Sequence, residues 1–149
     1  MKIAGTNVVF VPQERAYEML QDPGILASCM PGCESLEKIA ENEYAMKMKM
    51  VVAAVSGQFA GTVRIADPEP PGKFRLIVEG SGKIGFVKGS GVLTLTPNES
   101  GTEVAYDGEV NIGGTIASVG QRLIDTTARM LIKRFFAKLN GETARVAAD

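Results

Sequence analysis

The chain has 149 residues, and its 16 Lys or Arg against 17 Asp or Glu give a formal net charge of -1 at pH 7. This length suits a single domain with its own core. The near-neutral charge argues against a nucleic-acid binder, which normally carries a clear basic excess. The sequence contains no histidine, which removes the usual general base and every histidine-containing metal site. We predict no catalytic residue, no metal and no nucleic-acid partner.

The N-terminal segment MKIAGTNVVFVP lacks the sustained apolar run of a signal peptide. The longest uncharged stretch, residues 50–63, is shorter than the roughly 20 residues of a membrane span. We therefore expect a cytoplasmic protein. Its two cysteines, Cys29 and Cys33, rarely form a zinc site without histidine. We expect reduced thiols, because the cytosol is reducing, and a disulfide is the alternative.

The first part of the chain predicts one strand followed by two short helices. Residues 2–11 alternate apolar and polar side chains, as a strand does. The segment PQERAYEMLQDPG, which begins at Pro12, has a proline and a glutamate in its first turn and a second proline near its end, so it predicts a short helix. GILASCM adds a second helical segment before the turn at Pro31 and Gly32.

The middle of the chain predicts an antiparallel meander, because alternating segments are separated by the turn-forming sequences ENE, PEPPGK and PNESG. GSGKIG at 80–85 matches a dinucleotide-binding pattern, but a strand rather than a helix follows it, so we predict a hairpin turn there. The predicted strands are residues 34–40, 43–54, 57–67, 73–82, 86–96 and 102–112.

The last predicted element is a long helix from Thr115, a capping residue, to about Leu139, with Asn140 and Gly141 as its stop. Together these elements favour an α+β fold in which a curved antiparallel sheet of about seven strands wraps around the C-terminal helix. We expect one domain over residues 1–140 and a short tail over 141–149.

Three methionines in MKMKM share one face of a predicted strand, with the intervening lysines on the other. Methionine fills irregular gaps and adapts to what it contacts, so this face either lines a pocket or packs the core. On the neighbouring strands, the alternating positions predicted to face inward include five glycines, which either leave a hollow or let the sheet bend. We predict an apolar cavity lined by Met46, Met48, Met50, Phe59, Val63, Phe74, Leu76, Leu93, Tyr106, Leu123, Thr127 and Met130.

The long helix predicts a second site on the side away from the sheet. At about 100° per residue, its basic residues form a stripe with apolar residues beside it, where an ordinary solvated face would be polar. Such a surface can contact a membrane or an acidic partner, and the alternative is a solvated face with two incidental apolar residues. The predicted surface consists of Arg122, Arg129, Ile132, Lys133 and Phe136.

Three segments, CMPGCESLEKI at 29–39, GFVKGSGVLTLTP at 85–97 and IASVGQRLIDTTARMLIKRFFAKL at 116–139, resemble the carbon monoxide dehydrogenase G-subunit family. The resemblance implies the START-like, helix-grip fold of the SRPBCC superfamily, with a lipophilic cavity between sheet and helix. It also implies a non-enzymatic accessory protein that helps a molybdenum hydroxylase associate with the cytoplasmic membrane or its electron acceptor. A quinone or other isoprenoid lipid would suit a cavity lined by methionine.

Two other functions stay open at this point. The same superfamily includes enzymes of the polyketide cyclase or dehydratase kind, which would need polar groups converging inside the cavity. Only Tyr106, Thr127 and Arg134 are candidates for that role in this sequence. A purely structural interaction module is the remaining possibility, and it would be favoured if the methionines filled a closed core.

Overall fold

The structure is a computed structural model that describes residues 1–52 and 54–148, and the side chains of residues 1–52 and 54–142. Its strands are β1 (Lys2–Val9), β2 (Cys33–Ala40), β3 (Glu43–Val52), β4 (Val55–Glu69), β5 (Lys73–Gly82), β6 (Gly85–Asn98) and β7 (Gly101–Gly113). Its helices are α1 (Gln13–Met19), α2 (Pro23–Cys29), the short 3-10 helix η1 (Thr115–Val119) and α3 (Gln121–Ala148).

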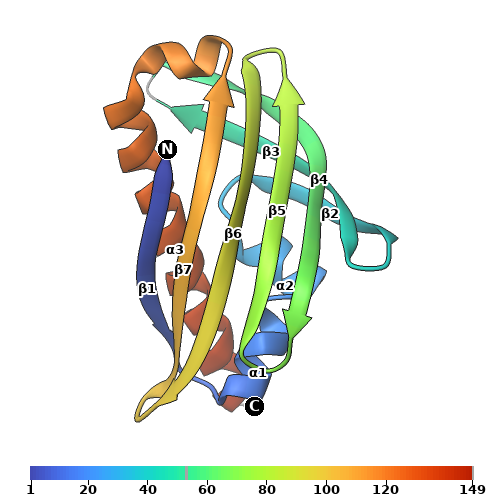
Figure 1. The fold of residues 1–149 in the computed structure, drawn as a ribbon, viewed down its shortest axis with the longest axis vertical. Helices are drawn as coiled ribbons and strands as arrows, with labels where there is room; N and C mark the ends of the chain where they lie inside the picture. The colour runs from blue at the N-terminus through green and yellow to red at the C-terminus, as the bar shows by residue number, and fades with distance from the viewer. Residues whose placement is uncertain (53, 149) are drawn as a thin grey trace.

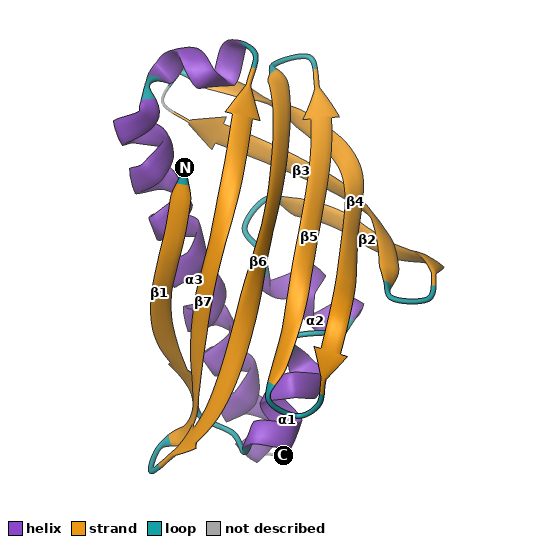
Figure 2. Ribbon diagram, viewed as in Figure 1, coloured by secondary structure: helices purple, strands orange, loops and turns teal. Residues whose placement is uncertain are grey.

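All seven strands belong to one antiparallel sheet with the order β1-β7-β6-β5-β4-β3-β2. The first two strands therefore lie at opposite edges, and α1 and α2 connect them. Figure 1 shows the sheet curving strongly, with β2 and β3 folding behind the other strands and α3 running behind β1 and β7. The helices gather on one side of the sheet (Figure 2). The predicted α+β fold, with a curved seven-stranded sheet around a C-terminal helix and two short helices after the first strand, is confirmed.

The two short helices form where proline and side-chain caps fix the first turn. In α1, Pro12 precedes the helix and Glu14 lies in its first turn. In α2, the Asp22 carboxylate accepts hydrogen bonds from the backbone N–H groups of Gly24 and Ile25, at 2.9 and 3.1 Å. These bonds satisfy two of the donors that a helix start leaves without a partner.

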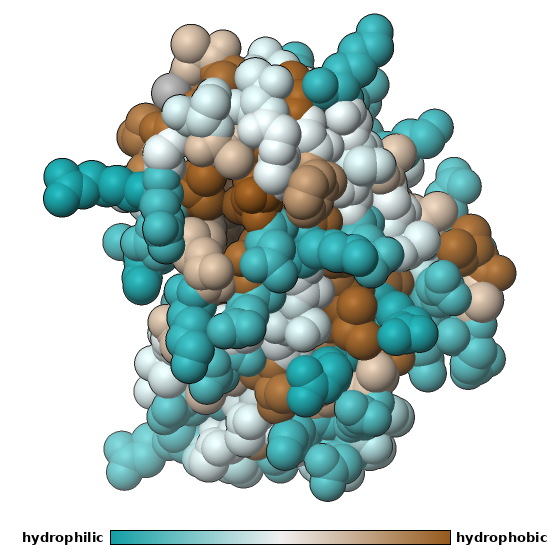
Figure 3. Space-filling view, turned by 45° about the horizontal axis from the view of Figure 1, so that its top comes forward, coloured by the Kyte–Doolittle hydropathy of each residue, from teal (hydrophilic) through white to brown (hydrophobic). Residues whose placement is uncertain are grey.

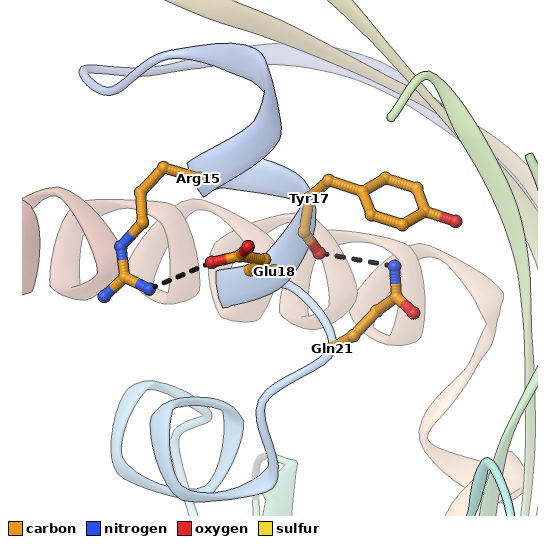
Figure 4. Close-up of polar contacts among 4 residues, drawn as sticks. All are labelled: Arg15, Tyr17, Glu18 and Gln21. Atoms are coloured by element: carbon orange, nitrogen blue, oxygen red, sulfur yellow. Dashed lines mark hydrogen bonds and ion pairs between the residues drawn. The ribbon is translucent and has the colours of Figure 1, made fainter. Parts of the chain in front are cut away.

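Polar side chains of α1 stay at its surface while its apolar face packs inward. Figure 4 shows the Arg15–Glu18 ion pair, 3.5 Å long, and the Gln21 side chain donating to the Tyr17 carbonyl oxygen at 3.3 Å. The Tyr17 ring itself meets Phe74 of β5 edge to face, with centroids 5.5 Å apart. Thus α1 closes one end of the sheet.

The long helix differs from its prediction at both ends. Residues 115–119 form η1, and Gly120, with a φ of 98°, separates η1 from α3 because few other residues adopt this conformation. At the other end, Asn140 and Gly141 do not stop the helix, which continues to Ala148 through most of the predicted tail. Asn140 instead ties α3 to the end of β1: its amide donates to the Val8 carbonyl oxygen at 2.9 Å and accepts from the Phe10 N–H at 3.2 Å.

The buried side chains form two separate clusters. The large cluster joins α1, α2, the C-terminal part of α3 and one end of the sheet, and the small cluster lies at the other end beneath η1. The large cluster comprises Val9, Ala16, Tyr17, Met19, Leu20, Cys29, Tyr44, Ile65, Phe74, Leu95, Val104, Phe136 and Leu139. The small cluster comprises Val52, Phe59 and Ile116.

Candidate functional site

The space between the two clusters is bounded by one row of residues that crosses five strands. In register, β3 to β7 place Tyr44, Val63, Val78, Gly89 and Val110 side by side on the face that α3 covers. Val63 is buried, whereas Val78 and Val110 are half-buried, and none of these three valines is a member of either cluster. This row is apolar; Tyr44 belongs to the large cluster, whereas the three valines lie outside both clusters.

Glycines surround this row, but most of them serve the curvature of the sheet. A Cβ at Gly61 would overlap the Glu79 carbonyl oxygen, and one at Gly108 would lie 2.6 Å from the Ser90 carbonyl oxygen. Both glycines therefore let neighbouring strands approach closely. At Gly80, by contrast, a Cβ would find Met46 Cε at 3.5 Å and Phe59 Cβ at 3.7 Å, which are ordinary contacts. Of these three positions, only Gly80 leaves room for a side chain.

The three methionines point to the inner face, as the alternation predicts, while Lys47 and Lys49 are exposed on the other. Met46 is buried, opposite Gly61, and its terminal methyl reaches toward Gly80. Met48 and Met50 are half-buried, and Met50 packs against the small cluster. The methionines thus extend along the inner face of β3 toward the small cluster.

The other sheet residues of the predicted cavity divide between the two clusters and the gap. Phe59 belongs to the small cluster and Phe74 to the large one, so both fill the protein core. Leu76, Leu93 and Tyr106 are half-buried and pack against the large cluster. Val63 lies in the row described above. Whether these residues also contact a ligand remains a prediction.

On α3, the inward position predicted for two of the cavity residues is wrong. Leu123 and Met130 are 45% and 42% exposed and do not face the sheet; Thr127 is half-buried. Conversely, Phe136, predicted at the surface, is 5% exposed within the large cluster, and Ile132 packs against that cluster. The buried face of α3 is therefore rotated from the predicted face by about 100°, which is the angle between successive residues of a helix. The prediction treated Ile116 and Val119 as part of the same continuous helix and placed its buried face accordingly. In the structure, Gly120 ends η1 before α3 begins, so the positions of Ile116 and Val119 do not set the buried face of α3.

A hollow of about 260 Å³ opens between the end of β7, η1 and the start of α3. Val110 and Ile124 line it, and Val110 also belongs to the row described above. Figure 3 shows hydrophobic side chains recessed between polar ones on the upper face of the molecule. The full lining is Met1, Val110, Asn111, Ile112, Ala117, Gln121 and Ile124.

Sequence reasoning did not identify this hollow. Its residues come from the first residue, a strand end, a 3-10 helix and a helix start, and no local period connects them. The one available signal was the Gly113–Gly114 pair together with Gly120, which bracket a segment that cannot continue either the strand or the helix. A second hollow, of about 420 Å³, lies outside the sheet and helix interior, among turn residues such as Pro12, Pro97 and Gly101.

The three polar residues that an enzyme was predicted to need inside the cavity, Tyr106, Thr127 and Arg134, do not all lie there. Tyr106 stacks on Phe136 with ring centroids 6.4 Å apart, and its hydroxyl lies over Gly5 of β1. Arg134 is exposed, so it does not join Tyr106 and Thr127 inside. Among the described residues there is no group of three or more acidic, cysteine or histidine side chains that could hold a metal ion.

Cys29 and Cys33 are free thiols. Cys29 is buried and Cys33 half-buried, and burial raises the pKa of both thiols, opposed by hydrogen bonds that involve Ser28 and the Ser35 carbonyl. Since only the thiolate reacts readily, both should be poor nucleophiles at neutral pH.

We expect iodoacetamide to modify both cysteines much more slowly in the native protein than in urea, with Cys29 the slower of the two. Peptide mass spectrometry after timed quenching measures each rate. Equal rates in the native and unfolded protein would contradict the burial of both thiols.

Three basic residues of the predicted surface are exposed, and its contact with a membrane or partner stays a prediction. Arg122, Arg129 and Lys133 are all exposed on α3. Asp125 accepts a hydrogen bond from Arg129 Nε at 2.9 Å, and this bond, with the carboxylate charge, raises the pKa of the guanidinium. No helix in the described part of the chain combines the length and the hydrophobicity that a membrane span requires.

Comparison with known proteins agrees with this fold. A conserved protein from Geobacillus kaustophilus, of known structure, is 36% identical and superposes with a TM-score of 0.92, covering 97% of this chain and 96% of that one. A START superfamily protein from Mycobacterium smegmatis is 13% identical, with a TM-score of 0.75 and coverage of 97% and 98%. A protein from Chromobacterium violaceum is 20% identical, with a TM-score of 0.70 and coverage of 94% and 95%.

The two more distant structures show the shared fold alone. No curated protein matches the chain. The family model for the G subunit of carbon monoxide dehydrogenase (CoxG) matches residues 5–144, which is most of the sequence. The chain belongs to this carbon monoxide dehydrogenase G-subunit family, CoxG.

Proposed function

We propose that this protein binds a lipophilic small molecule, of the quinone or isoprenoid class, between α3 and the sheet. In this proposal it is a non-enzymatic accessory protein that helps a molybdenum hydroxylase associate with the membrane or its electron acceptor. Membership in the CoxG family and the START-like fold support a ligand-binding accessory role in general. The quinone and the hydroxylase partner are the finer parts of the proposal.

The observation that carries the proposal is the division of the core into two clusters. A domain usually has one contiguous core with smaller satellite clusters beside it, so the side chains between the clusters carry the argument. Here, Val78 and Val110 are half-buried and belong to neither cluster, and Val110 also lines the hollow beside Ile124. Half-buried apolar side chains on the inner face of the sheet suit a hydrocarbon ligand, because contact with the ligand would remove their remaining apolar surface from water.

The inner surface also suits a binder better than an enzyme. General acid–base catalysis needs a titratable group within hydrogen-bond reach of the reacting atom. The half-buried polar side chains predicted for such a role are Tyr106 and Thr127, and Tyr106 is held in a ring stack with Phe136. No observation in the described residues favours the cyclase or dehydratase alternative.

Replacing Met48 by Glu should weaken uptake of a short-chain naphthoquinone by about tenfold or more, because an unpaired carboxylate would face the apolar interior. Native mass spectrometry of protein titrated with the naphthoquinone measures the bound fraction. The matched control is Lys47→Glu, which places the same charge on the exposed side of the same strand.

Thermal unfolding checks that both variants are folded, and Val110→Glu, beside the hollow, repeats the test at the other end of the row. Wild-type affinity in both Met48→Glu and Val110→Glu would count against ligand binding at this place. Equal weakening by Lys47→Glu would show that the effect is not specific to the inner face.

A further inference from the structure

The side of the sheet that faces away from the helices carries charges of both signs in an ordered pattern. We call this side, over β4, β5, β6, β7 and β1, the outer sheet face; Figure 1 shows it from the front, with β6 in the middle. Each of Arg75, Val92 and Asp107 has a chain neighbour that packs against the large cluster on the inner side. These three side chains therefore point outward.

The strand register places these residues in one row across five strands, which we call the Val92 row. Val92 pairs with Arg75 of β5 on one side and with Asp107 of β7 on the other. The row ends in Ala66 of β4 and Ala4 of β1. From either end, the order is an alanine, a charged residue, the valine, a residue of the opposite charge and an alanine. A rotation of 180° about an axis along β6 therefore exchanges the two charges and the two alanines.

The two charges of the Val92 row do not pair with each other within one chain. They lie two strands apart, which is about 10 Å and beyond ion-pair distance. Arg75 Nε contacts Asp67 at 3.4 Å, in an exposed ion pair of the kind that contributes little to stability. The guanidinium has further N–H donors at its other two nitrogens. Asp107 is exposed and forms no ion pair with any of the described residues.

We propose that two copies of this chain associate through their outer sheet faces, related by a two-fold axis that runs along β6 past Val92. In this dimer, Arg75 of each copy faces Asp107 of the other, and the two Val92 side chains meet on the axis. Ala4 and Ala66 lie opposite each other and leave room for close approach. Stacked sheets lie about 10 Å apart with their strands nearly aligned, a separation that an arginine and an aspartate side chain together span.

The other outward residues of β6 lie on the same axis, so each would meet its own copy. Ser90 and Thr94 are small and polar. Lys88, the only charged residue of β6, is paired with Glu79 at 3.6 Å, which offsets the repulsion between the two lysines. Phe86, at the start of β6, is 46% exposed. It gives the axis an aromatic contact of the kind that is enriched in protein interfaces.

A neighbouring row brings two like charges together at the edges of the dimer. The axis places Arg64 of one copy near Lys2 of the other. In register, Arg64 has Glu43 beside it, and Lys2 has Glu109. Each cation therefore has an acidic neighbour on its own sheet, which offsets the repulsion.

A second copy fits the outer sheet face better than a partner of one charge sign does. Glu103, Asp107 and Glu109 point outward from β7, whereas Lys73 and Arg75 point outward from β5. A partner of one sign would be attracted to one half and repelled by the other, but an isologous dimer matches both halves. Five strands about ten residues long cover roughly 800 Å², which is the area that each partner contributes to a stable interface.

Sedimentation velocity of the full chain over a range of concentrations measures the association, and we expect a dimer for the wild type. Arg75→Glu and Asp107→Arg each place like charges opposite each other at both contacts. Either change should raise the dissociation constant by about tenfold or more. The control Lys38→Glu reverses the charge of an exposed residue on β2, outside the outer sheet face, and should leave the association unchanged.

A mixture of the two variants tests the two-fold arrangement itself. Each variant alone repels its own copy, whereas a mixed dimer has opposite charges at both contacts. The mixture should therefore associate about as tightly as the wild type, and native mass spectrometry identifies the mixed dimer by its mass. The double variant Arg75→Glu/Asp107→Arg should regain self-association for the same reason.

Cross-linking tests the position of the axis without changing any charge. Val92→Cys places two thiols next to each other on the axis, so a short bis-maleimide should join the two chains. The matched control is Thr6→Cys, an exposed position of the same face on β1. It lies two strands from the axis, so its two copies would be roughly 20 Å apart and should not be joined. The wild type, with Cys29 and Cys33, serves as the blank.

Three outcomes would overturn the proposal: a wild type that stays monomeric at all concentrations, a dimer that both charge reversals leave intact, and a mixture that associates no better than the separate variants. Circular dichroism checks that every variant is folded. The dimer does not depend on the proposed function, because the outer sheet face lies on the side opposite α3. Monomeric variants should therefore take up naphthoquinone as the wild type does.

Discussion

Replacing Phe136 by Ala should lower the free energy of unfolding by about 3–5 kcal/mol, because it removes a buried ring from the large cluster. The ring is 5% exposed, stacks on Tyr106 and meets Phe135 edge to face with centroids 5.2 Å apart. The matched variant, Leu123→Ala, removes an exposed aliphatic side chain from the same helix. It should change the free energy of unfolding by less than about 1 kcal/mol.

Urea denaturation followed by circular dichroism measures both values. The comparison decides the rotation of α3 about its axis, since the sequence pattern predicted Leu123 inside and Phe136 outside. A large loss for Leu123→Ala with little change for Phe136→Ala would restore the predicted rotation and contradict the structure.

Replacing Gly61 by Ala should destabilise the protein by about 2–3 kcal/mol or more, because the new methyl group overlaps the backbone of β5. The nearest atom is the Glu79 carbonyl oxygen, which cannot move without separating two paired strands. Replacing Gly80 by Ala should instead be neutral or stabilising by about 0.4–1 kcal/mol. The methyl group fits there, and Ala reduces the entropy of the unfolded chain.

Gly61 and Gly80 face each other across the β4–β5 pair, so each serves as the control for the other. Thermal unfolding monitored by circular dichroism gives the difference directly. Similar losses at the two positions would mean that neither glycine leaves room in the interior.

The strands were predictable from the sequence because their signals are local. Alternation over a few residues places Met46, Met48 and Met50 on the inner face and Lys47 and Lys49 outside, and turn-forming residues set the boundaries. The two-residue connection between Gly82 and Gly85 likewise follows from GSGKIG. Antiparallel neighbours then follow from short connections, which leave few other topologies.

The rotation of α3 and the hollow at its start were not predictable in the same way. Gly120 breaks the helical phase, and a break of one residue moves every side chain by about 100°. The alternation of the strands places Gly61 and Gly80 on the inner face. Only the structure shows that a Cβ at Gly61 would overlap backbone, whereas one at Gly80 would meet Met46 and Phe59 at ordinary distances. The hollow depends on Met1, β7, η1 and α3, which no single pattern connects.

Native mass spectrometry of the gently purified full chain tests most directly whether the interior between the two clusters accepts a lipophile. The proposed function predicts a non-covalent adduct with the mass of an apolar molecule, released on unfolding and replaced when a naphthoquinone is added. A uniformly ligand-free protein that also takes up no added naphthoquinone would contradict it.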